Sequence, residues 1–122
     1  MKAGDYARIA LGCVRLANGT VALVAPGAFA RGLGLDPPND RAAAYSLRLF
    51  GVRTVLIGAQ LLGPDDGARG RAVRVAPFVH AADTIAAAIA GVTGQLPARG
   101  AAKAVLVSSA NTLLAALARA ER

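Results

Sequence analysis

The sequence predicts an all-α protein, a four-helix up-and-down transmembrane bundle that forms a single domain over residues 1–122. Three observations predict this fold. Four long apolar segments alternate with stretches rich in Pro, Gly and charge. Each segment has close to the roughly twenty residues that a helix needs to cross a bilayer. Hydrophobic residues make up 55% of the chain and charged residues only 17%.

The expected elements follow one another with clear stop signals. Pro26-Gly27 ends the first apolar segment and Gly63-Pro64 ends the second. The loop after the first segment has room for a short helical turn at residues 28–33, and Pro77 falls in the first turns of the third segment, where a kink or a late start is tolerated. High Ala and Leu content favours helix over strand. The four spans are expected at residues 6–24, 42–62, 72–92 and 101–118.

A lipid environment fits the segment surfaces better than water does. A soluble bundle needs a wide polar face on each helix. The fourth segment instead has one polar stripe, Ser108, Asn111 and Thr112, with no charge between Lys103 and Arg119. The stretch DTIAAAIAGV is equally poor in polar groups. The absence of Trp and the arginines inside three spans are the arguments for a soluble bundle, and we favour the membrane.

The distribution of Lys and Arg predicts the orientation in the cell membrane. With four spans, both termini and the middle loop share one side of the bilayer. That side carries seven basic residues against four, which places the termini in the cytoplasm by the positive-inside rule. The seven are Lys2, Arg8, Arg69, Arg71, Arg74, Arg119 and Arg122, and the four are Arg31, Arg41, Arg99 and Lys103.

The sequence lacks the residues that several classes of function require. The formal net charge of +7 is scattered without a Lys/Arg block or a set of stacking aromatics, so no nucleic-acid partner is predicted. One Cys and one His are too few for a disulfide, a metal centre or thiol redox chemistry. No phosphate-binding Gly-rich loop follows a strand. We therefore predict no metal and no cofactor.

Glycines recur at a spacing that matches helix packing. Gly12 and Gly19 lie seven apart in the first span, and Gly51 and Gly58 lie seven apart in the second. A spacing of seven keeps two residues on nearly one face of a helix. Each of these spans can therefore offer a smooth stripe for close packing.

Polar residues near the middles of the spans share one depth. The midpoints fall near residues 15, 52, 82 and 110, and the polar residues nearest to them are Arg15, Arg53, Asp83 and Asn111, with His80 one turn before Asp83. In an up-and-down bundle, residues at the middles of their helices meet at one level. The sequence therefore predicts a polar centre to which all four helices contribute.

Helical spacing refines this centre. Three pairs lie three residues apart and so project from one face of their helix. In the second span, five residues separate Arg48 from Arg53, which places them about 140° apart on the helix. They cannot both face the centre, and we expect Arg53 to be central and Arg48 to lie at the edge. The three pairs are Arg15 with Asn18, His80 with Asp83, and Ser108 with Asn111.

The charges of this centre do not balance. Arg15 and Arg53 bring two positive charges and Asp83 brings one negative, while His80 cannot remove the surplus. Buried charge without compensation is costly. We therefore expect a pocket for a lipophilic small molecule with an acidic or carbonyl group. The predicted ligand-binding residues are Arg15, Asn18, Arg48, Arg53, Ser108 and Asn111.

Two other functions stay open. A membrane enzyme of the isomerase, cyclase or epoxide-opening type would use His80 as acid and base and Asp83 as its orienting group or as a second base. A structural or accessory subunit would use the polar residues only for assembly, as a homo-oligomer or in a larger membrane complex.

Three stretches carry a family resemblance: RIALGCVRLANGTVALVAP, RLFGVRTVLIGAQLL and HAADTIAAAIAG. The chain resembles small actinobacterial four-helix membrane proteins of unknown function, which are loosely DoxX-like. The most specific element is R-x-F-G-x-R, formed by Arg48, Phe50, Gly51 and Arg53. The resemblance implies the four-helix membrane fold and supplies no activity or catalytic residues.

Overall fold

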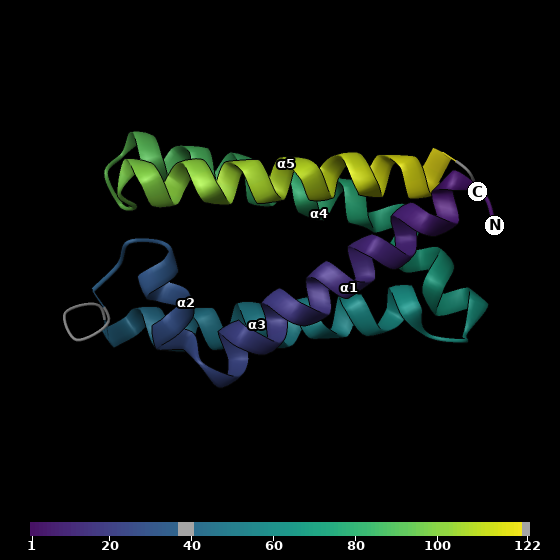
Figure 1. The fold of residues 1–122 in the computed structure, drawn as a ribbon, viewed down its shortest axis with the longest axis horizontal. Helices are drawn as coiled ribbons and strands as arrows, with labels where there is room; N and C mark the ends of the chain where they lie inside the picture. The colour runs from purple at the N-terminus through teal and green to yellow at the C-terminus, as the bar shows by residue number, and fades with distance from the viewer. Residues whose placement is uncertain (37–40, 121–122) are drawn as a thin grey trace.

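The computed structural model describes residues 1–36 and 41–120, and the described residues form five α-helices (Figure 1). The predicted all-α fold is confirmed. Four of the helices are long and apolar enough to cross a membrane, as expected of a multi-pass membrane protein. The helices are α1 (Ala3–Val24), α2 (Pro26–Gly32), α3 (Arg41–Leu62), α4 (Asp66–Val92) and α5 (Ala98–Ala120).

The short turn expected at residues 28–33 is helix α2, which begins at Pro26. Proline suits the first position of a helix because the N–H it lacks would have no partner there. Pro37 and Pro38, which follow in the sequence, lie outside the described residues.

The expected start of the third span at residue 72 was wrong, because α4 already begins at Asp66. The Asp65 carboxylate accepts hydrogen bonds from the backbone N–H groups of Gly67 and Ala68, at 2.8 and 3.1 Å, and so caps the helix. These hydrogen bonds, and then the nearby Arg71, lower the pKa of Asp65. Arg69 forms an ion pair with Asp66. The charged stretch that looked like a loop is therefore the first turns of a capped helix.

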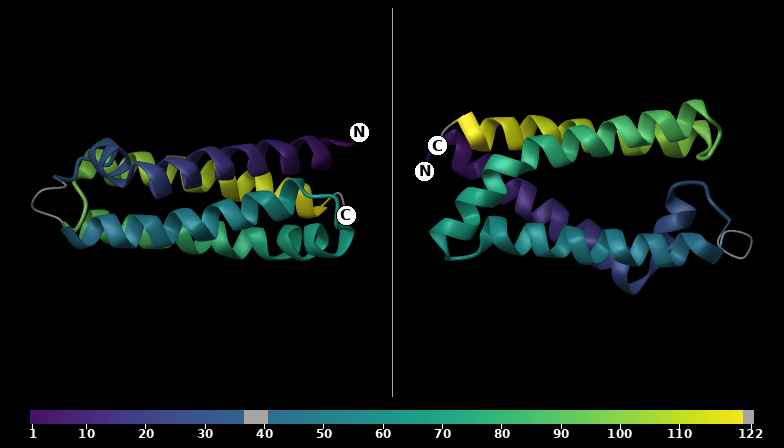
Figure 2. Two further views of the ribbon diagram at one scale, coloured as in Figure 1. Left: turned by 90° about the horizontal axis from the view of Figure 1, so that it is seen from below. Right: turned by 180° about the vertical axis from the view of Figure 1, so that it is seen from behind.

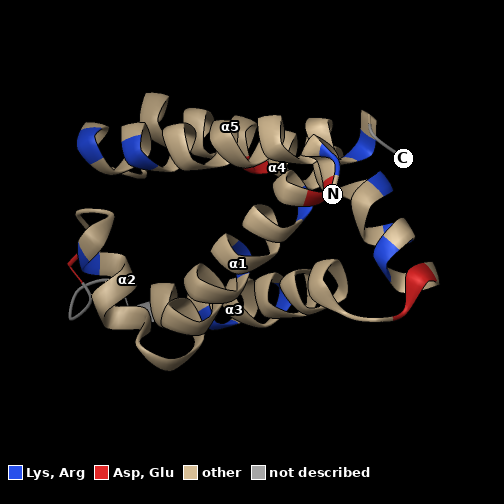
Figure 3. Ribbon diagram, turned by 45° about the vertical axis from the view of Figure 1, so that its right-hand side comes forward, with Lys and Arg blue, Asp and Glu red and all other residues tan. Residues whose placement is uncertain are grey.

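The bundle consists of two helix pairs. Helix α1 packs most extensively against α3, and α4 against α5, while α1 also contacts α5 and joins the pairs. Figure 1 shows the α4–α5 pair along one side and α3 along the other, with α1 crossing obliquely between them. Both chain ends lie at one end of the bundle, and α2 lies at the other. Figure 3 shows that many of the Lys and Arg residues lie near these two ends.

Glycines bring the backbones of α1 and α3 together, and the smooth stripe predicted on each helix faces the other. A Cβ atom on Gly51 would lie 2.7 Å from the carbonyl oxygen of Gly19 and 2.7 Å from the backbone nitrogen of Leu23. A Cβ atom on Gly58 would lie 3.0 Å from the carbonyl oxygen of Gly12. Such distances leave no room for a side chain. Glycine is therefore what permits this close approach.

Helix α4 changes direction along its length, which the right-hand view of Figure 2 shows. Pro77 lies inside this helix. Proline cannot donate a hydrogen bond to the carbonyl group four residues earlier, here that of Val73, and its ring crowds that group. The first part of α4 leaves the end of α3 obliquely, and the later part lies along α5.

The apolar core lies in the half of the bundle that contains the chain ends. It joins residues from α1, α3, α4 and α5, so all four long helices meet there. Small side chains dominate, which lets these helices approach closely. The core residues are Ala7, Leu11, Leu61, Ala72, Val73, Ala76, Ala115 and Ala118.

Candidate functional site

A pocket of about 580 Å³ occupies the other half of the bundle, between the two helix pairs and beside α2. Its α4 residues, Asp83, Ala86 and Ala87, all follow Pro77, where α4 lies along α5. Its walls are largely apolar and include two aromatic rings. The apolar lining consists of Phe29, Leu33, Leu47, Phe50, Ala86, Ala87, Ala104 and Val107.

The polar lining gathers mainly at the deep end, near the middles of the long helices. These residues are Arg15, Asn18, Thr54, Asp83, Ser108 and Asn111. At the other end, Lys103 of α5 donates a hydrogen bond to the carbonyl oxygen of Gly32 at the end of α2, at 3.2 Å. Eight residues separate Lys103 from Asn111 along α5, which at 1.5 Å per residue is about 12 Å. The pocket therefore has a polar deep end, apolar walls and a basic residue at the end beside α2.

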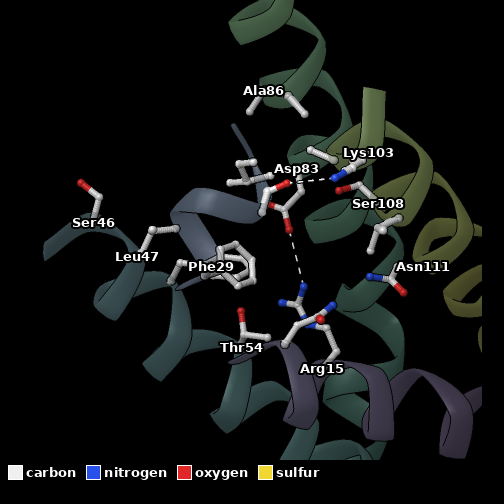
Figure 4. Close-up of a pocket in the computed structure, with 17 residues that line it drawn as sticks. Arg15, Phe29, Ser46, Leu47, Thr54, Asp83, Ala86, Lys103, Ser108 and Asn111 are labelled. Carbon is white, nitrogen blue, oxygen red and sulfur yellow. Dashed lines mark hydrogen bonds and ion pairs between the residues drawn. The ribbon is translucent and has the colours of Figure 1, made fainter. Parts of the chain in front are cut away.

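Arg15 is the centre of the deep end. It is only 2% exposed. Its Nη1 atom lies 3.4 Å from Nδ1 of His80 and 3.6 Å from Oδ2 of Asp83. Figure 4 shows the guanidinium group pointing from α1 toward Asp83, with Thr54 and Asn111 on either side. The helices thus bring their central polar residues together, as their shared depth predicted.

Arg53 binds Asp83 from outside the pocket. Its Nη2 atom lies 3.3 Å from Oδ1 of Asp83, and its side chain is 51% exposed. The guanidinium group also lies 5.8 Å from the ring centre of Phe50, a cation–π contact. Asp83 is therefore shared between Arg15, which lines the pocket, and Arg53, which does not.

Arg48 is exposed and does not line the pocket. The angular separation of Arg48 and Arg53 on α3 explains why the two side chains differ in position. Of the six predicted ligand-binding residues, the structure therefore places four in the pocket wall, namely Arg15, Asn18, Ser108 and Asn111.

His80 and Asp83, the residues of the acid–base hypothesis, take different positions. Asp83 lines the pocket, whereas His80 is 0% exposed and is not part of the lining. His80 faces Arg15 through Nδ1, and its Nε2 atom has no hydrogen-bond partner among the described residues. His80 therefore lies on the side of Arg15 away from the pocket, and a molecule in the pocket would contact Arg15 and Asp83 rather than His80.

Sequence reasoning missed Thr54, Phe50, Phe29 and Lys103. Leu47, Phe50 and Thr54 lie at the spacing of one helix face, and all three line the pocket. That face could have been found from the glycines, because Gly51 and Gly58 fix the side of α3 that α1 covers. Phe29 lies on α2 and its ring centre is 5.8 Å from that of Phe50. No pattern in the sequence places α2 against α3.

No protein-family model matches the chain, and no significant match was found among curated proteins or solved structures. The resemblance to DoxX-like proteins stays a prediction.

Proposed function

We propose that this is an integral protein of the cell membrane that binds a lipophilic small molecule carrying an acidic or carbonyl group. The observation that carries the proposal is a buried arginine, Arg15, at the polar end of a largely apolar pocket. Apolar walls with a few convergent polar groups are typical of small-molecule sites, and the volume lies within their range of roughly 300–1,000 Å³.

The charge of the deep end supports a ligand that accepts hydrogen bonds. Two guanidinium groups, Arg15 and Arg53, share the single carboxylate of Asp83. An anion beside Arg15 would offset the remaining positive charge, and a carbonyl oxygen would accept hydrogen bonds from its N–H groups. The apolar walls formed by Leu47, Phe50 and Val107 would cover the hydrocarbon part of such a molecule.

The ends of the bundle support cytoplasmic termini. The end with the chain termini carries six described basic residues, and Arg122, which the prediction also counted, lies outside the described residues. The opposite end carries four. The excess favours the cytoplasmic side for the termini by the positive-inside rule. The six are Lys2, Arg8, Arg69, Arg71, Arg74 and Arg119, and the four are Arg31, Arg41, Arg99 and Lys103.

Binding accounts for the geometry better than the two alternatives. Acid–base catalysis by His80 would require its ring to reach the pocket, and Arg15 and Asp83 lie at the pocket instead. A subunit with a purely structural polar core needs no pocket of this volume between its helix pairs. Nothing in the geometry specifically favours either alternative.

Native mass spectrometry of the purified full-length chain tests the proposal. We expect a bound small molecule on the unaltered protein and on Ala102→Trp, whose exposed position lies outside the pocket wall. Ala104→Trp fills the pocket from the same helix and should remove that molecule while the protein remains folded. Equal retention by both variants, or no bound molecule on any of them, contradicts the proposal. Recovery of the protein without detergent in the soluble fraction contradicts the membrane assignment.

A further inference from the structure

We infer that the polar group of the ligand is a carboxylate, held side-on by the Nε–Nη2 edge of Arg15. This inference rests on the proposed function, since it assumes that the pocket binds a small molecule. The inference narrows the polar group of the ligand from any acidic or carbonyl group to a carboxylate, and it names the protein atoms that bind this carboxylate.

The guanidinium group of Arg15 has polar partners at Nη1 but none along the edge formed by Nε and Nη2. Nη1 faces Nδ1 of His80 and Oδ2 of Asp83. Nε and Nη2 are buried and have no hydrogen-bond partner within residues 1–36 and 41–120. The N–H groups of Nε and Nη2 lie parallel in one plane along a single edge of a guanidinium group. Their fork matches the two oxygens of a carboxylate.

Thr54 provides a third donor at the same end of the pocket. It is 0% exposed, and its Oγ1 atom also lacks a partner in the described part of the chain. Figure 4 shows the Thr54 side chain beside the Arg15 guanidinium group, on the side of the pocket away from Asn111. Buried donors without partners cost free energy, whereas a carboxylate has enough lone pairs to accept from all three atoms.

The local charge selects a singly charged group. Arg15 and Arg53 together carry two positive charges, and Asp83 carries one negative charge. A carboxylate monoanion makes this group of charges neutral. A phosphate ester with two negative charges would leave an excess negative charge close to Asp83, where like charges repel. A neutral ester or ketone would leave the positive charge uncompensated.

The pocket also sets the direction in which the molecule lies. Arg15 and Thr54 line the deep end, and apolar walls extend from there toward Lys103, about 12 Å from Asn111 along α5. The carboxylate therefore lies near the middle of the bilayer, with the hydrocarbon part extending toward the α2 end. An ordinary membrane lipid has the reverse arrangement, with its polar group at the surface.

A series of ligands that share one chain tests the inference on the unaltered protein. Competition against radiolabelled dodecanoate is measured on the full-length chain in nanodiscs, with unlabelled dodecanoate, methyl dodecanoate and dodecyl phosphate as competitors. We expect dodecanoate to bind at least about tenfold more tightly than the methyl ester or the phosphate. Equal or tighter binding of either competitor overturns the inference.

Two variants test the atoms, each with a matched control. Arg15→Lys keeps the charge but removes the fork, and we expect about a tenfold loss of dodecanoate affinity; Arg48→Lys, at the exposed position outside the pocket, should have no effect. Thr54→Val keeps the shape and should lose about threefold to fivefold, with the exposed Thr20→Val as its control. Unchanged affinity in Arg15→Lys overturns the inference, and so does unchanged affinity in Thr54→Val.

The result separates this inference from the proposed function. If the methyl ester binds as well as the acid and Ala104→Trp removes both, the pocket function stands and the carboxylate inference fails. If Ala104→Trp changes the binding of none of the three molecules, the proposed function itself fails. If Arg15→Lys does not fold, the ligand series and Thr54→Val still decide the question.

Discussion

The α1–α3 interface and the space between α3 and the α4–α5 pair show opposite ways of packing apolar helices. Between α1 and α3, glycines leave no room for even one added carbon atom. Between α3 and α5, the helices leave a pocket of about 580 Å³. Helix α3 takes part in both: Gly51 and Gly58 contact α1, and the adjoining positions Leu47, Phe50 and Thr54 line the pocket.

The difference shows that apolar composition alone does not decide how closely helices pack. Backbones approach where small residues on two helices face each other in register. They separate where α4 bends at Pro77 and where α2 lies against α3 at the end of the bundle. One region therefore holds α1 and α3 together, while the other leaves a pocket between the helix pairs.

The largest expected effect comes from breaking the close interface. Gly51→Ala places a Cβ atom 2.7 Å from two backbone atoms of α1, so the helices must separate, and we expect a loss of about 3 kcal/mol in the free energy of unfolding. Unfolding by SDS in mixed micelles measures it. Gly32→Ala is the control, since a Cβ atom there has no described neighbour beyond its own helix within 4 Å. Equal midpoints for Gly51→Ala and the unaltered chain would contradict the tight packing.

A smaller loss of stability is expected when the ion pairs of Asp83, which connect α4 to α1 and α3, are removed. Asp83 on α4 binds Arg15 on α1 and Arg53 on α3. Asp83→Asn removes the charge that both guanidinium groups share, and we expect a loss of about 2 kcal/mol in the same unfolding measurement. Asp66→Asn is the control on the same helix, because its ion pair with Arg69 is solvent-exposed and contributes little. A similar, small change in both variants would show that Asp83 does not hold the helices together.

The smallest effect on stability is expected from Pro77. Pro77→Ala restores an N–H group that can donate to the carbonyl group of Val73, so α4 straightens, and stability should change by less than about 1 kcal/mol. The pocket, however, should change shape. Spin labels at Ser46 and Ala86, introduced as cysteines after Cys13→Ser, report the distance across it. We expect a shifted distance distribution, with Pro97→Ala as the control; an unchanged distribution would rule out Pro77 as the cause of the bend.

Much of the fold could be predicted because its signals are local. Span lengths, stop signals and glycines seven apart all follow from residues close in the sequence. The structure confirms the helices, and it uses the glycine stripes in the α1–α3 contact. The shared depth of Arg15, Asp83 and Asn111 also follows from position along the helices. The predicted start of α4 was wrong because its composition assigns the charged stretch before residue 72 to a loop, whereas capping by Asp65 lets that stretch form a helix.

The lining of the pocket could not be predicted because it depends on how each helix is rotated and on where α4 bends. Arg53 and His80 have the right depth, yet neither lines the pocket. Phe29 reaches it because α2 packs against α3, and Lys103 reaches it from the end of α5 that lies beside α2. The depth of a residue in the bundle follows from its position along its own helix. Whether its side chain faces the pocket depends on how that helix is rotated, which its contacts with the other helices determine.

The half-exposed side chain of Arg53 has a consequence for the bilayer itself. It lies near the middle of α3, where insertion scales assign an arginine a cost of roughly 2.5–3.5 kcal/mol. The ion pair with Asp83 and the Phe50 ring offset part of this cost. The exposed remainder draws water and lipid headgroups toward the helix, so the membrane beside α3 should be thinner and wetter than elsewhere around the protein. In a bilayer, we therefore expect the lipid around this bundle to be non-uniform, with a hydrated dip next to Arg53.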